Sequence, residues 1–198
     1  MTPLSDQPGR RPVLETTTLH HGMVWDLVRD TVDLGAAGTV RREYVRHPGA
    51  VAVLVLDDED RVLLLHQYRH PAGARLWEPP AGLLDVVGED LREAAARELA
   101  EEADLTAGSW WTLVDYLTTP GGSDEAIRVF LARDLQPVPE AERHVRVAEE
   151  SDMELRWVPL DEAVAAVLAG QLRNPSTVVG ELAAAAARAR GWSGLRPA

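Results

Sequence analysis

Residues 82–105, GLLDVVGEDLREAAARELAEEADL, decide the fold, because a glycine-containing loop runs there directly into a helix-forming segment. Asp90 and Glu93 have the spacing of a capping box, in which two side chains satisfy the free amides at a helix start. Apolar residues then recur at intervals of three and four, which predicts one buried face on the helix. These residues are Leu91, Ala94, Ala95 and Leu99.

Three glutamates follow on the same predicted helix. Glu98 precedes Glu101 by three residues and Glu102 by four, so the three side chains share one face. Such a cluster is consistent with a solvated helix surface in an acidic protein. It is also a donor set for Mg²⁺ or Mn²⁺, hard cations that prefer carboxylate and carbonyl oxygens. Arg97, four residues before Glu101, can form an ion pair with it.

Around these glutamates the sequence resembles the Nudix hydrolases. Their motif runs glycine, five residues, Glu, seven residues, Arg-Glu, an aliphatic residue, any residue, Glu-Glu, any residue, glycine, aliphatic. Two positions depart from it, since Gly82 stands six residues before Glu89 and Asp104 replaces the second glycine. A loop accepts an extra residue, and Asp tolerates the left-handed conformation common at helix ends. The positions in register are Glu89, Arg97, Glu98, Leu99, Glu101, Glu102 and Leu105.

The resemblance implies the Nudix fold, an α+β architecture with a mixed β-sheet sandwiched between helices. It extends over most of residues 20–185 and is similar to the ADP-ribose pyrophosphatase branch, although Pro79 stands where leucine is more often found. Four separate strings carry this second likeness, in the expected order. They are QYRHP (67–71), WEPPAG (77–82), PGGSDE (120–125) and AEESDM (148–153).

Carried over by position, the resemblance assigns the metal ligands. Glu98 and Glu102 bind through their carboxylates, and the carbonyl of Ala81 completes the first site. Glu101 shares or bridges ions, so two or more Mg²⁺ or Mn²⁺ ions are expected. Glu150 is the expected general base or late metal ligand, arriving on a loop. The expected activity is a metal-dependent cleavage of ADP-ribose to AMP and ribose 5-phosphate, where the choice of substrate rests on the loop 119–125 and on Arg69 with Glu78.

The same carry-over assigns the substrate-binding residues. Arg69 would bind the diphosphate, a role that suits a guanidinium fork that keeps its charge. Glu78 and Glu125 would face the ribose hydroxyls. Alternatives stay open, because Arg69 could form a surface salt bridge and Glu125 could cap a turn beside Asp124. Further pocket-lining residues are Leu83, Pro120 and Gly121.

Other interpretations also remain at this stage. Only alignment to the family favours Glu150 over Glu149 as the late glutamate. The substrate could be another nucleoside diphosphate sugar, or the chain could be a Nudix-like module that senses a nucleotide without cleaving it. The presence of all three helix glutamates favours an enzyme.

Composition excludes several other chemistries. The 198 residues include 32 Asp and Glu against 20 Lys and Arg, for a net charge of −12, whereas nucleic-acid binding needs a cationic face. Without cysteine there is no disulfide or thiolate site, and without lysine there is no Schiff base. No apolar run approaches the ~18 residues of a membrane helix, and the first ten residues lack a signal-peptide core. A cytoplasmic protein without a membrane partner is expected.

Alternating and apolar runs outline the remaining elements. We expect a tail and β extension over residues 1–47 and the Nudix domain over 48–198. The extension contains an antiparallel pair, 23–34 with 39–47, whereas 51–56 and 61–68 form a hairpin around an acidic tip. Residues 77–85 are expected as a loop. Further strands are expected at 110–117, 126–132 and 154–158, and helices at 161–169, with an acidic N-cap, and 176–190.

A homodimer formed through residues 20–47 is also expected. Two strands alone are rarely stable, and the relatives that this chain resembles exchange this segment between subunits. Trp25 and Arg42 would then reach the partner's pocket, with Trp25 stacking on adenine. Trp25 could equally belong to the core.

Overall fold

The computed structural model describes residues 4–145 and 153–198, and these divide into two compact units. The first unit contains residues 4–48 together with the loop 119–125. The second unit contains the other described residues, beginning at Gly49. Because the loop 119–125 interrupts the second unit in sequence, the chain enters the first unit twice.

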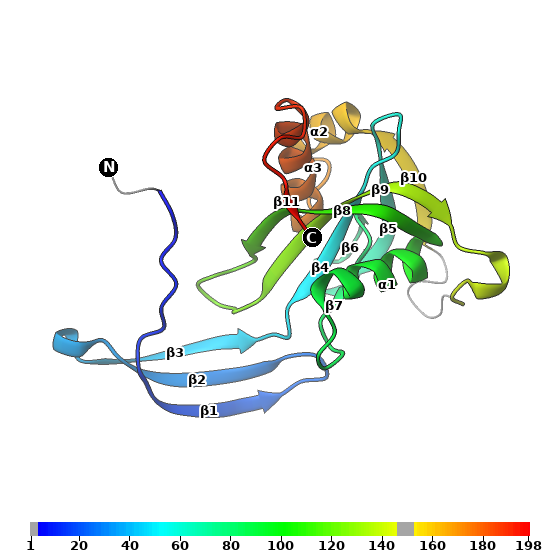
Figure 1. The fold of residues 1–198 in the computed structure, drawn as a ribbon. Helices are drawn as coiled ribbons and strands as arrows, with labels where there is room; N and C mark the ends of the chain where they lie inside the picture. Colours follow the sequence, from blue (N-terminus) through cyan, green and yellow to red (C-terminus); the bar gives the residue numbers. More distant parts are fainter. Residues whose placement is uncertain (1–3, 146–152) are drawn as a thin grey trace. The chain divides into compact units, whose positions relative to one another are not determined.

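The first unit is built on a three-stranded antiparallel sheet, with β2 in the middle (Figure 1). The predicted pairing of residues 23–34 with 39–47 is confirmed by β2 and β3, which meet at a turn where Gly35 and Gly38 have positive φ. The preceding strand, VLETTTLHH, was not predicted, since its central threonines give no apolar alternation. The three strands are β1 (Val13–His21), β2 (Asp26–Asp33) and β3 (Thr39–Arg46).

The loop 119–125 is hydrogen-bonded to the end of β3. The Val45 amide donates to the Gly122 carbonyl at 2.9 Å, and the Asp124 amide donates to the Val45 carbonyl at 3.1 Å. Val45 and Ser123 also form a parallel β-bridge. These bonds extend the sheet by one short segment and fix the loop within the first unit.

The second unit contains two β-sheets. In the five-stranded sheet, β4 pairs in parallel with β9 and antiparallel with β7, so the sheet is mixed. Its strands, in sheet order, are β11 (Arg196–Pro197), β8 (Leu105–Leu117), β9 (Ala126–Pro137), β4 (Ala50–Val55) and β7 (Ala81–Leu83). The three-stranded sheet, in order, contains β10 (Glu154–Pro159), β5 (Arg61–Arg69) and β6 (Ala74–Glu78).

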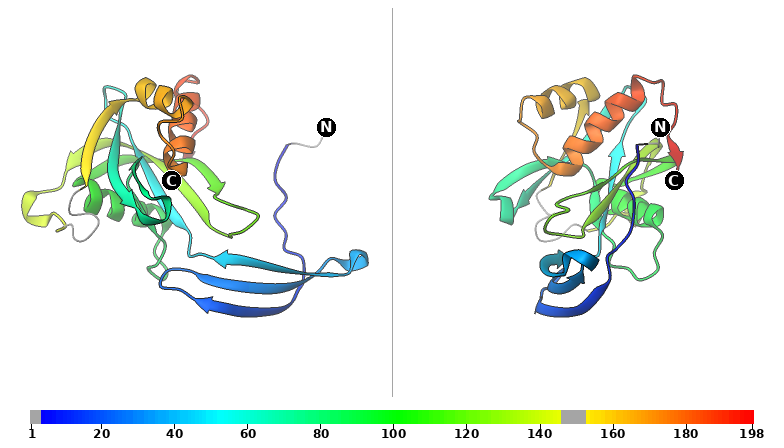
Figure 2. Two further views of the ribbon diagram at one scale, coloured as in Figure 1. Left: turned by 180° about the vertical axis from the view of Figure 1, so that it is seen from behind. Right: turned by 90° about the vertical axis from the view of Figure 1, so that its left-hand side faces the viewer.

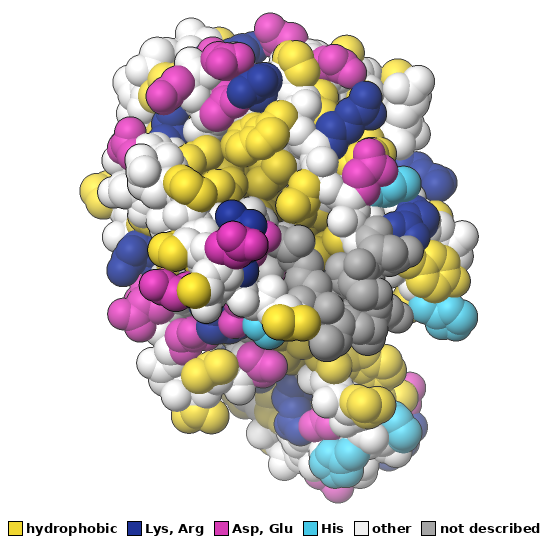
Figure 3. Space-filling model, turned by 90° about the vertical axis from the view of Figure 1, so that its right-hand side faces the viewer, with side chains coloured by type: hydrophobic (Ala, Val, Ile, Leu, Met, Phe, Trp, Pro, Cys, Tyr) yellow, Lys and Arg dark blue, Asp and Glu magenta, His cyan; other side chains and the backbone are white. Residues whose placement is uncertain are grey.

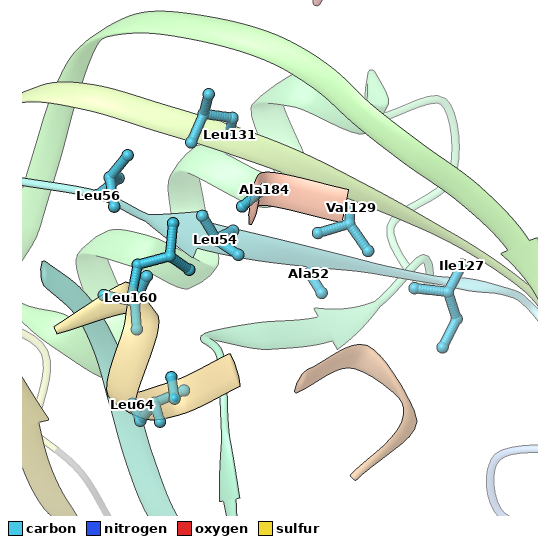
Figure 4. Close-up of a cluster of buried hydrophobic side chains, with 11 residues drawn as sticks. Ala52, Leu54, Leu56, Leu64, Ile127, Val129, Leu131, Leu160 and Ala184 are labelled. Carbon is cyan, nitrogen blue, oxygen red and sulfur yellow. The ribbon is translucent and has the colours of Figure 1, made fainter. Parts of the chain in front are cut away.

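The described part of this unit has three α-helices: α1 (Leu91–Ala103), α2 (Leu160–Leu168) and α3 (Pro175–Arg188). Helices α1 and α3 pack on the five-stranded sheet, and α2 packs on α3 and on β5 and β10 of the three-stranded sheet. Alternate residues of β4 belong to two different cores, since Val53 packs in the cluster that contains Leu99 of α1, and Leu54 in the cluster that contains Leu160 and Ala184 (Figure 4). The α1 helix therefore lies on one face of the sheet, with α2 and α3 on the other (Figure 2). The expected fold class, a mixed sheet between helices, is confirmed.

The expected hairpin between residues 51–56 and 61–68 is wrong. These segments are strands, but β4 and β5 belong to different sheets, and the chain pairs between them through the isolated bridge of Leu56 with Val62 and the adjoining Asp57–Arg61 backbone hydrogen bond. The Asp57 carboxylate accepts hydrogen bonds from the Glu59 and Arg61 amides and fixes the turn that separates them. Both edges of β4 are instead paired with strands that come later in the chain, β7 and β9.

Two smaller expectations also need correction. Residues 77–85 are not a continuous loop, because they contain the end of β6 and all of β7, joined through Pro79 and Pro80. The N-cap of α2 is Pro159, without a side-chain hydrogen bond, and its acidic residues lie in the first turn. The helix at 176–190 is confirmed as α3, which Asn174 caps by accepting the Thr177 amide at 3.1 Å.

Charged side chains of opposite sign are interspersed on the face shown in Figure 3. Ion pairs among the described residues include Arg61 with Asp57 at 2.7 Å and Arg128 with Asp115 at 2.7 Å. Within the described ranges, no helix combines the length and apolar character needed to cross a membrane.

Candidate active site

The acidic helix α1 is fixed at both ends by aspartates. Asp90 caps its start by accepting the Arg92 amide at 2.9 Å. Asp104 closes its end at φ 54°, ψ 35°, and its amide donates to the Ala100 carbonyl at 3.2 Å. Asp104 thus adopts the left-handed conformation predicted for it, and the last turn of α1 keeps the geometry that a glycine would supply.

The short strand β7 lies against the glutamates of α1. The buried Glu102, with 6% of its surface exposed, accepts the Ala81 amide at 2.8 Å. A β-carbon on Gly82 would overlap the carboxylate of Glu98, so this position admits only glycine without moving that carboxylate. The structure therefore brings Ala81, Glu98 and Glu102 together, as the sequence predicted, and it shows the role of Gly82.

Arg97 binds three carboxylates around this face. Its guanidinium donates to Glu89 at 3.0 and 3.1 Å, to Glu98 at 2.6 Å and more loosely to Glu101 at 3.4 Å. Hydrogen bonding to Arg97 lowers the pKa of Glu89, and hydrogen bonding to Glu89 raises the pKa of Arg97. Arg97 thus holds the loop before the helix against the acidic face. This link was not anticipated, although the fixed spacing of Glu89 and Arg97 signalled it.

The donor set fits a hard divalent cation. Burial raises the pKa of Glu98 despite the neighbouring Arg97, so its charge is poorly solvated and a nearby cation would stabilise it. Glu98, Glu101 and Glu102 offer only oxygen donors, which Mg²⁺ and Mn²⁺ prefer. Within residues 4–145 and 153–198, no three His, Asp or Glu side chains already converge in the arrangement of a metal site.

Arg69 and Glu78 are bound to each other across β5 and β6. The Arg69 guanidinium donates to the Glu78 carboxylate at 2.6, 3.0 and 3.1 Å, and Glu78 is only 2% exposed. The sequence assigned these residues to separate parts of a substrate, whereas in the structure the buried Glu78 fixes the orientation of Arg69. Leu83, at the end of β7, is partly buried.

A recess of about 440 Å³ within the first unit collects three of the predicted substrate residues. Arg42 from β3 lines it together with Pro120 and Gly121 from the bound loop. Glu125, at the end of that loop, lies 3.6 Å from the His47 ring nitrogen. Trp25 is 43% exposed in the segment before β2 and does not line the recess.

The expected late glutamate, Glu150, and its alternative, Glu149, lie outside the described residues. Of the string AEESDM (148–153), only Met153 belongs to the described residues, and β10 begins directly after it at Glu154.

The sequence of this chain matches a known protein family and several known proteins. The NUDIX domain family matches residues 45–177. An ADP-ribose pyrophosphatase of Mycobacterium tuberculosis is 47% identical over 86% of this chain and 81% of its own length. A methanol dehydrogenase activator of Bacillus methanolicus is 34% identical over 84% of this chain and 88% of its own length.

The fold is shared with a structure described as an ADP compounds hydrolase. The two superpose with a TM-score of 0.73 over 94% of this chain and 99% of the other, at 20% identity. This likeness supports the architecture, whereas the sequence match supports the family. The chain belongs to the NUDIX domain family.

Proposed function

We propose that this protein hydrolyses the diphosphate of ADP-ribose, giving AMP and ribose 5-phosphate. The observation that carries the proposal is the junction of α1 with β7, where Glu98 and Glu102 lie against Gly82 and Ala81. The choice of substrate is supported by the 47% identity to an ADP-ribose pyrophosphatase. The second relative has a different described activity, so membership of the family alone leaves the substrate open.

Glu98, Glu101 and Glu102, with the Ala81 carbonyl and Glu150, would hold Mg²⁺ or Mn²⁺, in two or more positions. Such ions, when bound, offset the charge of the diphosphate and lower the pKa of coordinated water. Arg97 maintains this carboxylate set by hydrogen bonding to Glu98. Without a cation, the acidic face would repel an anionic substrate.

The remaining roles belong to side chains outside the helix. Arg69, oriented by the buried Glu78, would donate to diphosphate oxygens and stabilise charge on the leaving phosphate. Glu150 would accept the proton of the attacking water, whose oxygen ends on one of the two product phosphates. Leu83 of the second unit, and Pro120 and Gly121 of the first unit, are proposed as further substrate-contacting residues.

Specificity would reside in carboxylates that face ribose hydroxyls, as Glu125 is proposed to do. A site that hydrogen-bonds a substrate hydroxyl discriminates against analogues that lack it, since the acceptor is then left without a partner. We also propose a homodimer formed through residues 20–47, in which Trp25 and Arg42 contact the substrate of the partner subunit.

The test is a substrate panel with Mg²⁺, comparing ADP-ribose, ADP-glucose, GDP-mannose and ATP, with products separated by chromatography. We expect ADP-ribose to have the highest kcat/KM and to yield AMP. Glu125→Ala should reduce the ratio of kcat/KM for ADP-ribose to kcat/KM for ADP-glucose. Glu140→Ala, at an exposed site, should leave this ratio unchanged. A clear preference for GDP-mannose or ATP would overturn the proposed substrate while leaving the hydrolase assignment intact.

A further inference from the structure

The recess in the first unit is lined by the N-terminal tail as well as by the sheet and the loop. Arg10 and Arg11 line it beside Arg42 of β3. Its volume of about 440 Å³ lies within the ~300–1,000 Å³ range of small-molecule sites. Three carboxylates, Asp30, Glu43 and Asp124, line it too, so the recess is formally neutral in a protein of net charge −12.

The carboxylates that share this recess are engaged inside the fold. Asp30 is buried and accepts the Tyr44 hydroxyl at 3.2 Å. Glu43 accepts the Arg29 guanidinium at 2.8 Å. These bonds engage Asp30 and Glu43 without using the arginines of the recess, whereas the third lining carboxylate, Asp124, accepts the His47 amide at 2.8 Å and lies near Arg10.

The arginines, in contrast, are weakly compensated. Arg10 is 4.0 Å from Asp124, at the limit of an ion pair, and 74% of its side chain is exposed. Among residues 4–145 and 153–198, no carboxylate forms an ion pair with Arg11 or Arg42, although Arg42 donates to the Arg41 carbonyl at 2.9 Å.

The neighbouring loop leaves room for a ligand. No atom lies within 4 Å of the place where a β-carbon of Gly121 or Gly122 would stand, so a ligand can approach the backbone. Guanidinium groups present forked N–H donors that match phosphate oxygens. An anion with a phosphate group and a polar body therefore suits the recess.

We propose that Arg10 and Arg11 of the N-terminal tail are further substrate-binding residues, which act with Arg42 on the phosphate-bearing part of a nucleotide. The identity of that nucleotide, ADP-ribose, rests on the proposed function. The Asp33 amide, which donates to the Pro12 carbonyl at 2.9 Å, anchors the tail directly after the two arginines.

Binding can be measured without turnover by calorimetry in EDTA, using ADP-ribose, AMP and inorganic phosphate separately. The test protein is the double variant Arg10→Gln, Arg11→Gln. The control is the double variant Arg173→Gln, Arg190→Gln, which removes the same charge from exposed sites in the second unit. We expect the tail variant to bind ADP-ribose and AMP about tenfold more weakly, and the control to match the wild type.

Measuring all three ligands distinguishes a failure of the proposed role of Arg10 and Arg11 from a failure of the proposed substrate. Unchanged AMP and ADP-ribose affinity in the tail variant would overturn the proposal, as would a wild-type protein that binds none of the three. Equal losses in the tail variant and the control would also overturn it, because net charge alone would then explain the effect. If the enzyme prefers another substrate but AMP binding still depends on the tail, the proposed function fails and the role of the arginines stands.

Discussion

Glu98 and Glu102 lie one helical turn apart, yet their surroundings differ. Glu102 is buried and accepts a backbone amide from β7, whereas Glu98 is bound to Arg97 and lies against Gly82. The Glu102 carboxylate is therefore oriented by β7, and the Glu98 carboxylate by Arg97 of the same helix. Ala81 thus orients Glu102 through its amide, while its carbonyl is one of the proposed metal ligands.

Replacing Glu102 with Gln should reduce Mg²⁺-dependent activity by at least about 100-fold while the fold survives. The substitution preserves volume, and the side-chain carbonyl of Gln can still accept the Ala81 amide. Activity and thermal unfolding measured together test this, with Glu93→Gln on the exposed side of the same helix as control. A folded and fully active Glu102→Gln enzyme would remove Glu102 from the metal site.

Gly82→Ala should reduce kcat about 10–100-fold with little change in stability. The added β-carbon displaces the end of a flexible side chain, Glu98, rather than backbone. Steady-state kinetics and urea unfolding on the same preparation separate the two effects. Full activity in this variant would mean that the position of Glu98 is unimportant for the reaction.

Much of the acidic helix α1 could be predicted from the sequence, because helical spacing alone places Glu98, Glu101 and Glu102 on one face. The bond between Arg69 and Glu78 could not be predicted. It depends on the pairing of β5 with β6, and strand register is a tertiary property that no local pattern contains.

At the level of elements, α1 ends on a residue that departs from the family motif. Asp104 adopts φ 54°, where a β-carbon is unfavourable and glycine is not. Asp104→Ala should therefore be less stable than Asp104→Gly by about 1 kcal/mol in the free energy of unfolding. Both variants remove the carboxylate, so urea titration of the pair isolates the backbone effect. Equal stabilities would contradict this account.

Helix α3 carries a glutamate in the core. Glu181 is 1% exposed, and its Oε2 atom has no hydrogen-bond partner in the part of the chain that the structure describes. Burial raises the pKa of Glu181 to about 8, from 4.5 for an ordinary glutamate. The folded state therefore keeps a proton that the unfolded state releases.

The free energy of unfolding should consequently fall as pH rises from about 4.5 to about 8, by on the order of 1 kcal/mol per pH unit, and level off above. Glu181→Gln should remove that part of the slope and leave the protein more stable than wild type at pH 8. Urea denaturation at pH 5, 6.5 and 8 measures the free energy of unfolding of each variant, with the exposed-site variant Glu140→Gln as control. Parallel pH profiles for Glu181→Gln and wild type would show that Glu181 is ionised in the fold.

Strands and helices could be located from the sequence more readily than their partners. The apolar run at 51–56 is a strand, but its adjacency to 61–68 wrongly suggested a hairpin, since its partners β7 and β9 come later in the chain and no local pattern identifies them. Strand β1 was missed for the opposite reason. Its residues are nearly all exposed, so it has no apolar pattern to detect.

In the whole molecule, the first unit has little core of its own. Most of β1 is exposed, and Met23, Val24 and Trp25 present apolar surface beside it. Small isolated sheets are marginally stable, so a second copy of this segment is the proposed partner.

We expect wild-type protein to behave as a dimer in light scattering at micromolar concentration, and Trp25→Ser to shift it toward monomer with a higher KM. Leu168→Ser, at an exposed apolar site on α2, serves as the control. A fully active wild-type monomer would contradict both the dimer and the proposed contact of Trp25 with the partner's substrate.

The position of β4 has a consequence for biosynthesis. Both of its neighbours follow it in the chain, and Ala50 does not meet its parallel partner Ile127 until most of the protein has been translated. Until then the nascent polypeptide carries the segment VAVLVL (51–56) with its β9 edge unpaired, and such segments promote aggregation. Pairing across so long a loop is also slow. The second unit therefore closes only after β9 has emerged from the ribosome, and its yield depends on the solubility of this one hexapeptide during that delay.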